Sequence, residues 1–141
     1  MSSSILVKDY MDYDPHAIPV SYDVRNVVQA LLKAKVHGAP VIDENRKLVG
    51  FVSEQDCIKD LLNDIFYCEE PATVSSVMRK DVITVTADTS IVQLAENMSD
   101  KRPKNYPVVD EQGMLIGLIN RSQVLKALLE NADDCYIKKA N

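Results

Sequence analysis

The chain contains an internal repeat with a constant offset of 67 residues. The stretch PVIDENRKLVGFVSEQD, residues 40–56, returns without a gap as PVVDEQGMLIGLINRSQ, residues 107–123, with 6 of 17 positions identical. Over residues 11–62 the copies share 11 identities in 52 positions without a gap. Because the offset also preserves the apolar helix stripes, the helix caps and the hairpin, the repeat is structural rather than compositional.

Size and charge limit what two such units can be. A unit of about 60 residues buries only about 60% of its unfolded surface, so the two copies are expected to share a core. The composition, 46% apolar and 26% charged, is that of a globular protein. A net charge of −5 argues against a nucleic acid polymer as partner, because such proteins usually carry a basic face. Local basic groups can still hold one small anion.

Targeting signals and cysteine motifs are not evident. No basic segment precedes a long apolar run, and no segment approaches the roughly 20 apolar residues that span a bilayer, so a soluble cytoplasmic protein is expected, with no membrane partner. The spacing of Cys57, Cys68 and Cys135 fits neither a disulfide framework nor a CxxC pair. We expect Cys57 to be a buried thiol.

The pattern of the first copy predicts five elements after a short helical turn at residues 7–11. A short or edge strand is expected at 18–20, because Pro19 donates no ladder hydrogen bond. A helix capped by Asp23 follows and ends near His37 and Gly38. Strands at 40–42 and 47–52 form a hairpin, and Ser53 begins a second helix with the apolar stripe Cys57, Ile58, Leu61, Leu62, Ile65 and Phe66.

The second half repeats this order. The predicted fold class is therefore α+β, with two βαββα units packed about a pseudo-two-fold axis. The boundary is placed in a polar joint, so that residues 1–67 form the first repeat and residues 68–141 the second repeat with a C-terminal tail.

Two polar residues at the end of the hairpin could bind a ligand. Ser53 and Asp56 lie at a strand-to-helix turn, where free N–H groups and the helix dipole can receive a phosphate, and a carboxylate can hold ribose hydroxyls. The same residues can instead form a capping box that satisfies only the helix itself. The second copy has Asn120 and Gln123 at these positions, which is compatible with one competent and one degenerate site.

These features together resemble a tandem pair of CBS domains, the regulatory module named after cystathionine β-synthase, over about residues 7–129. The repeated xPVhDE hairpin supports this, and GFVSEQD is similar to the family's G-h-x-[ST]-x-x-[DN] nucleotide motif. The resemblance implies a cleft between the copies that binds AMP, ADP, ATP or S-adenosylmethionine as a regulatory ligand, with no obligatory cofactor. It also implies a homodimer.

The resemblance implies roles for individual residues as well. Ser53 would approach phosphate and Asp56 would hold the ribose, while the base would lie against Ile18 and the Ala39-Pro40 segment. Tyr106 and Pro107 occupy the latter positions in the second copy. Positive charge for phosphate is offered by His37 and by the basic residues of the second copy, Lys101, Arg102, Lys104 and Arg121.

Catalysis is not expected, because the chain shows no nucleophile motif, glycine-rich phosphate loop or metal-ligand spacing. The leading hypothesis is a non-catalytic sensor whose halves shift when ligand binds, which changes an interface with a dimer mate or an unknown regulated protein. The rival hypothesis is a dimeric interaction scaffold that binds no ligand and uses the motif residues only as caps. A thiol-based redox sensor is a third reading.

Overall fold

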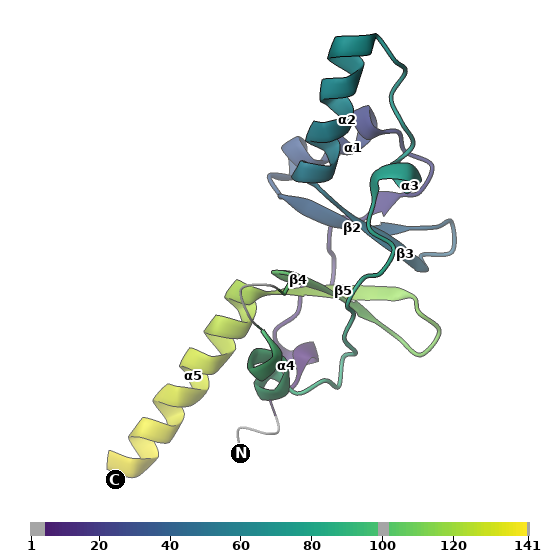
Figure 1. The fold of residues 1–141 in the computed structure, drawn as a ribbon. Coiled ribbons are helices and arrows are strands. Elements are labelled where there is room, and N and C mark those ends of the chain that lie inside the picture. The colour runs from purple at the N-terminus through teal and green to yellow at the C-terminus, as the bar shows by residue number, and fades with distance from the viewer. Residues whose placement is uncertain (1–4, 99–101, 141) are drawn as a thin grey trace. The chain divides into compact units, whose positions relative to one another are not determined.

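In this computed structural model the backbone is described for residues 5–98 and 102–140, and side chains are described as far as residue 132. The chain forms two compact units (Figure 1). The first-repeat unit comprises Pro15–Val82 and Glu111–Leu115, and the second-repeat unit comprises Met1–Asp14, Ile83–Asp110 and Ile116–Asn141. Both units combine strands with helices, so the predicted α+β fold class is confirmed.

The first-repeat unit holds a three-stranded sheet in the order β1-β2-β3. Strand β1 runs parallel to β2, and β2 is antiparallel to β3. The predicted edge strand at Ile18 is confirmed, and it comprises only Ile18 and Pro19, after which the N–H of Val20 still donates to the carbonyl of Ile42 at 2.8 Å. The elements of this unit are β1 (Ile18–Pro19), α1 (Val24–Ala34), β2 (Gly38–Ile42), β3 (Leu48–Ser53), α2 (Glu54–Tyr67) and α3 (Val74–Val77).

The second-repeat unit has the same plan with a smaller sheet. Its hairpin is the pair β4-β5, and its predicted first strand is reduced to one parallel bridge, Val85 with Val108. That bridge stands 67 positions after the pair Ile18 with Val41 in the first-repeat unit. The elements are the 3-10 helix η2 (Val7–Asp9), α4 (Ile91–Asn97), β4 (Asn105–Val109), β5 (Leu115–Asn120) and α5 (Arg121–Ala140).

Each unit includes a short segment that, in the sequence, lies immediately before the other copy of the repeat. Residues 73–79 pack in the first-repeat unit, where Phe51 and Arg79 exchange two backbone hydrogen bonds of 2.9 Å. Residues 6–12 pack in the second-repeat unit, where Asp12 and Leu118 exchange bonds of 2.8 and 3.0 Å. The packing units therefore cross the sequence boundary between the repeats in both directions.

This exchange explains why both copies have a glycine on the second hairpin strand and a methionine in the exchanged segment. A Cβ on Gly50 would lie 2.5 Å from Sδ of Met78 and 2.7 Å from a backbone oxygen of Arg79. A Cβ on Gly117 would lie 2.8 Å from a backbone oxygen of Asp12 and 3.0 Å from Sδ of Met11. The glycine leaves room for the exchanged segment, and the methionine fills that room, so each residue type requires the other.

Each unit has its own apolar core, built from residues of both its helices, the hairpin and the exchanged segment. The first-repeat core contains Ile18, Val24, Val27, Leu31, Ala39, Val41, Val52, Cys57 and Val74. The second-repeat core contains Ile5, Val7, Met11, Ile91, Leu94, Tyr106, Val108, Ile119, Val124 and Ala127.

One local prediction was wrong. The end of α1 was predicted near Gly38, but the helix ends at Ala34, and Lys35 takes the left-handed conformation (φ 58°) while its N–H bonds the carbonyls of Leu31 and Leu32. Gly38 instead begins β2, where a Cβ would lie 2.8 Å from Cε1 of Phe51. The helix predicted to begin after Ser53 is confirmed as α2, and of its apolar stripe only Cys57 is buried.

The close approach at Gly50 gives a stability prediction. Replacing Gly50 with alanine places a methyl group against the backbone of Arg79, which cannot yield as a flexible side chain would. We expect Gly50→Ala to lower the free energy of unfolding by about 1–3 kcal/mol. Urea denaturation followed by circular dichroism measures this loss.

The exposed Lys47→Ala change on the same hairpin serves as the control and should stay within about 0.5 kcal/mol of the parent. A Gly50→Ala protein as stable as the parent would contradict the packing described for β3.

Candidate ligand-binding site

The junction of β3 and α2 holds the two residues predicted to receive ligand. Ser53 ends β3 and caps α2 with an extended backbone (φ −116°, ψ 165°). Its N–H and its hydroxyl both donate to Oδ2 of Asp56 at 2.9 Å, and the N–H of Asp56 donates to Oγ of Ser53 at 3.3 Å. The capping box that the sequence allowed is therefore present.

The cap does not occupy the whole carboxylate of Asp56. Both bonds end on Oδ2, and within residues 5–98 and 102–132 no hydrogen bond reaches Oδ1. Asp56 is half-buried rather than enclosed. Each carboxylate oxygen has two acceptor positions, so this side chain can cap α2 and still accept hydrogen bonds from hydroxyl groups.

The junction of β5 and α5 repeats the cap with neutral side chains. The N–H of Asn120 donates to Oε1 of Gln123 at 2.8 Å, and the N–H of Gln123 donates to Oδ1 of Asn120 at 2.9 Å. Capping is thus achieved equally well without a carboxylate. Helix capping alone does not explain why the first copy carries Asp56.

The residues beside the two junctions differ in charge. In the first-repeat unit the N–H of Glu54 bonds the carbonyl of His37 at 2.9 Å, and the two side chains pair through Nδ1 and Oε1 at 2.9 Å. In the second-repeat unit the same backbone bond joins Arg121 to Lys104 at 2.9 Å. Two cations therefore stand where the first copy has a histidine and a carboxylate.

The residues predicted to contact a base are buried in the cores. Ile18 and Ala39 are 2% and 1% exposed and belong to the first-repeat core, and Pro40 is fully buried. Pro107 is fully buried as well. Their contact with a base stays a prediction.

Tyr106 adds a third difference between the copies, because it stands where the first copy has Ala39. It is 2% exposed and belongs to the second-repeat core. Burial raises the pKa of its phenol, and the positive charges of Arg102 and Arg121 partly oppose that rise. A large aromatic ring therefore occupies in the second copy the position that a methyl group occupies in the first.

The structure thus gathers the predicted site residues into two sets. Ser53, Asp56 and His37 lie at the β3–α2 junction of the first-repeat unit. Lys104 and Arg121 lie at the β5–α5 junction of the second-repeat unit, while Lys101 lies outside the described residues.

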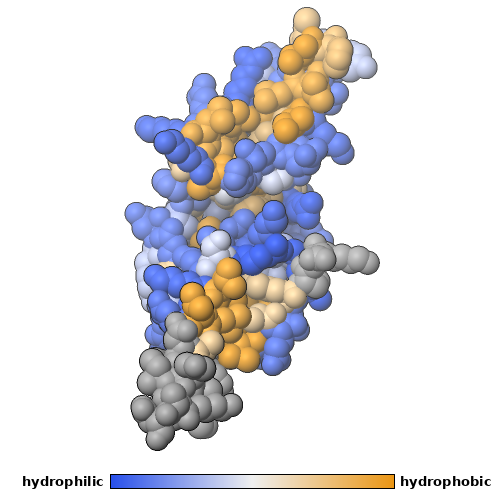
Figure 2. Space-filling model, turned by 90° about the vertical axis from the view of Figure 1, so that its left-hand side faces the viewer, coloured by the Kyte–Doolittle hydropathy of each residue, from blue (hydrophilic) through white to orange (hydrophobic). Residues whose placement is uncertain are grey.

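Sequence reasoning missed an apolar groove between α1 and α2. The groove has a volume of about 480 Å³ and is lined mainly by Val28, Leu31, Leu32, Ile58 and Leu61. His37, Ser53, Glu54 and Gln55 line it as well. The sequence feature that could have indicated this groove is the apolar stripe of α2. This stripe is wider than the helix surface that the core of the unit buries. Figure 2 shows apolar surface over these helices.

Two other kinds of site are not found in the described residues. No group of three or more histidine, cysteine or acidic side chains there could hold a metal ion. Among the described helices, none is both long and apolar enough to cross a bilayer.

Comparison with known proteins identifies the pattern. Residues 7–63 and 74–130 each match the family model of the CBS domain. An uncharacterized protein of Methanocaldococcus jannaschii, MJ1426, is 29% identical over 89% of this chain and 92% of its own length. Relatives that carry enzyme names are matched over less than a quarter of their own length.

Solved structures agree in fold. The crystal structure of CBSX2, a protein of Arabidopsis thaliana, in complex with AMP has a TM-score of 0.78 at 30% identity, covering 91% of this chain and 98% of that one. The CBS domain pair of MJ0100, in complex with 5′-methylthioadenosine and S-adenosyl-L-methionine, has a TM-score of 0.73 at 25% identity, covering 87% and 98%.

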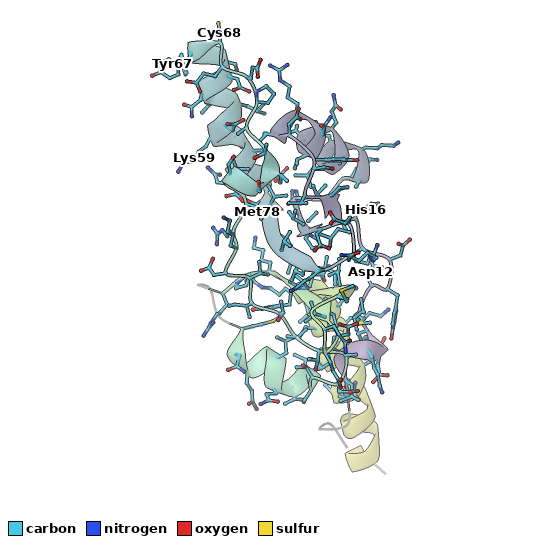
Figure 3. The ribbon with its side chains drawn as sticks, turned by 90° about the vertical axis from the view of Figure 1, so that its right-hand side faces the viewer. Asp12, His16, Lys59, Tyr67, Cys68 and Met78 are labelled. Carbon is cyan, nitrogen blue, oxygen red and sulfur yellow. The ribbon has the colours of Figure 1, made fainter. Side chains whose placement is uncertain are left out.

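The two described thiols differ in environment. Cys57 is 2% exposed, and burial, with a smaller contribution from nearby carboxylates, raises the pKa of its thiol to about 11. Cys68 is exposed at the C-cap of α2, at the outer end of that helix (Figure 3).

This contrast predicts selective labelling. About one Cys57 thiol in a thousand is ionised at pH 8, and the thiolate is the reactive form. In a Cys135→Ser protein at pH 8, we expect a thiol reagent to modify Cys68 in the native state and Cys57 only after unfolding. Peptide mass spectrometry identifies the modified residue, and rapid native labelling of Cys57 would contradict its burial.

Proposed function

Because the chain belongs to the CBS-domain family, we propose that it is a non-catalytic regulatory module for an adenosine-type ligand. The ligand is an adenosine nucleotide, AMP, ADP or ATP, or an adenosyl compound such as S-adenosylmethionine. The protein acts as a homodimer and transmits ligand binding through that interface or to a regulated protein. Its location in the cytoplasm stays a prediction from the sequence.

The observation that carries the proposal is the carboxylate of Asp56. The neutral pair Asn120 and Gln123 caps α5 with bonds of 2.8 and 2.9 Å, so a cap needs no charge. One oxygen of this carboxylate caps the helix, and the other can still accept hydrogen bonds. Such a carboxylate is suited to binding two neighbouring hydroxyl groups, as in a ribose. Relatives of similar fold were crystallised with AMP and with S-adenosyl-L-methionine, both of which carry a ribose.

The charges beside the two junctions support unequal roles. At β3–α2, Glu54 stands beside Ser53, and its carboxylate repels a phosphate. At β5–α5, Lys104 and Arg121 attract an anion, and the positive end of the α5 helix dipole adds to this attraction. We infer that the first copy provides the ribose contact and that the second copy favours negative charge.

A dimeric scaffold that binds no ligand is the second candidate. The observation that favours it is the complete capping box at Ser53 and Asp56, which gives both residues a structural role without any ligand. The two candidates differ in one respect that can be measured. The scaffold tolerates any residue that caps, whereas the sensor requires the carboxylate.

The change Asp56→Gln separates these candidates. Glutamine preserves the capping box, as Gln123 does in the second copy, but removes the carboxylate. Thermal denaturation of the parent with AMP, ATP and S-adenosylmethionine should show stabilisation by one of them, about 2.7 kcal/mol at 100 times its dissociation constant. We expect Asp56→Gln to lose most of that stabilisation while unfolding normally without ligand.

Gln123→Ala provides the matched control. It loses a cap in the second copy, worth about 1 kcal/mol, and should keep the stabilisation by ligand. No stabilisation of the parent by any of these ligands, or equal stabilisation of the Asp56→Gln protein, would favour the scaffold.

A further inference from the structure

The β3–α2 junction of the first-repeat unit has few hydrogen-bond donors left for a ligand. The hydroxyl of Ser53 donates to Oδ2 of Asp56 at 2.9 Å. The N–H of Glu54 donates to the carbonyl of His37 at 2.9 Å, and the N–H of Asp56 donates to Oγ of Ser53 at 3.3 Å. A phosphate binds at a helix N-terminus through N–H groups that are free to donate to it. Here two such groups and the hydroxyl are already used within the protein.

The junction offers hydrogen-bond acceptors instead. Within the part of the chain whose side chains are described, Oδ1 of Asp56 and Oε2 of Glu54 receive no hydrogen bond. The other carboxylate oxygen of Glu54, Oε1, is hydrogen-bonded to Nδ1 of His37 at 2.9 Å. A ligand that fits these atoms must supply donors, such as hydroxyl or ammonium groups.

The side chains around the junction are also negative. The first two turns of α2 carry the carboxylates of Glu54, Asp56 and Asp60 with one cation, Lys59, which gives a formal charge of −2. Among the described side chains, no lysine or arginine forms an ion pair with Glu54 or Asp56. Burial raises the pKa of the neighbouring Cys57 thiol to about 11, and these three carboxylates add to the rise. An anionic group is therefore repelled at this end of α2.

The equivalent turns of α5 have the opposite charge. Residues 121–127 contain two cations, Arg121 and Lys126, and no carboxylate, which gives a formal charge of +2. Arg121 stands at the position of Glu54, and its N–H makes the same backbone bond, to the carbonyl of Lys104 at 2.9 Å. This position can thus carry either charge while the backbone bond is kept. The negative charge of Glu54 is therefore not a requirement of the fold.

We propose that Glu54 makes the β3–α2 junction selective for adenosyl compounds whose 5′ group is neutral or cationic, and that it excludes adenosine 5′-phosphates. The inference rests on the proposed function, in which Asp56 holds the ribose, and it adds which of those ligands the first copy takes. Ser53 and Glu54 adjoin the carboxylate that holds the ribose, so the group on the 5′ carbon lies beside them. S-adenosylmethionine suits this position, because its ammonium group supplies donors and its net charge is positive.

A series of ligands of different charge tests the selectivity of the full-length protein. The probes are AMP, which is an anion, 5′-methylthioadenosine, which is neutral, and S-adenosylmethionine. Isothermal titration calorimetry at about 50 mM salt, where exposed charges are weakly screened, measures the site that Asp56→Gln abolishes. AMP is measured by its competition with S-adenosylmethionine, so that AMP held by the second copy does not contribute. We expect AMP to bind at least about tenfold more weakly than either of the other ligands.

Substitutions of Glu54 test the cause of this preference. Glu54→Gln and Glu54→Arg change the charge in two steps, and the second introduces the residue type that α5 has at Arg121. We expect the preference for S-adenosylmethionine over AMP to fall in Glu54→Gln and to fall further, by at least about tenfold in total, in Glu54→Arg. Glu69→Arg is the matched control. It makes the same change of charge at an exposed position beyond the end of α2 and should alter the preference by less than about twofold.

The outcomes separate this inference from the proposed function. If AMP binds the parent as tightly as S-adenosylmethionine, or if Glu54→Arg leaves the preference unchanged, the selectivity is overturned and the binding of adenosine-type ligands stands. An equal response to Glu69→Arg would also overturn it, because the charge of the whole chain would then set the preference. If none of the three ligands binds the parent, the proposed function itself is overturned.

Discussion

A methionine side chain lies over a glycine on the second hairpin strand of each unit, and the rest of the fold depends on that contact. Met78 covers Gly50, and Met11 covers Gly117, each with backbone hydrogen bonds from the same segment to the strand. The segment that brings the methionine comes from before the other copy, so neither sequence repeat is a complete unit by itself. Two copies in one chain are therefore a requirement of the packing.

The two copies differ at the positions that are predicted to contact a ligand. Asp56 and Gln123 cap their helices with similar geometry, yet one is a carboxylate and the other an amide. The side chains of Glu54 and His37 are hydrogen-bonded to each other at 2.9 Å, and the second copy has Arg121 and Lys104 at these positions. These differences change charge and leave the backbone bonds unchanged. They are changes of the kind that alter binding while preserving the fold.

Most of the fold could be predicted from the sequence, because the residue patterns that specify each element are local and occur in both copies. The hairpin, the edge strand at Ile18 and the caps at Asp23 and Ser53 follow from turn residues and periodicity, and the repeat supplied each signal twice. The exchange of the segments around Met11 and Met78 was not predictable, because it depends on contacts between distant residues. The left-handed end of α1 at Lys35 was missed because a glycine nearby gave a stronger local signal.

The residues of the candidate site could be predicted from the sequence, but their hydrogen bonds and their exposure could not. Ser53 and Asp56 were found from their spacing, and the structure supplies their hydrogen bonds. The apolar stripe of α2 was recognised, yet periodicity alone could not say that Ile58, Ile65 and Phe66 face outwards. A helix pattern shows which residues share a face, and only packing decides whether that face is covered.

In the proposed function the two copies are unequal, and only the copy with Asp56 holds a ribose strongly. Isothermal titration calorimetry of the purified full-length protein with AMP, ATP and S-adenosylmethionine measures the number of sites directly. We expect one strong site per chain for at least one of these ligands, and we expect Asp56→Gln to abolish it. Two equivalent sites per chain, or no heat of binding with any of the three ligands, would contradict it.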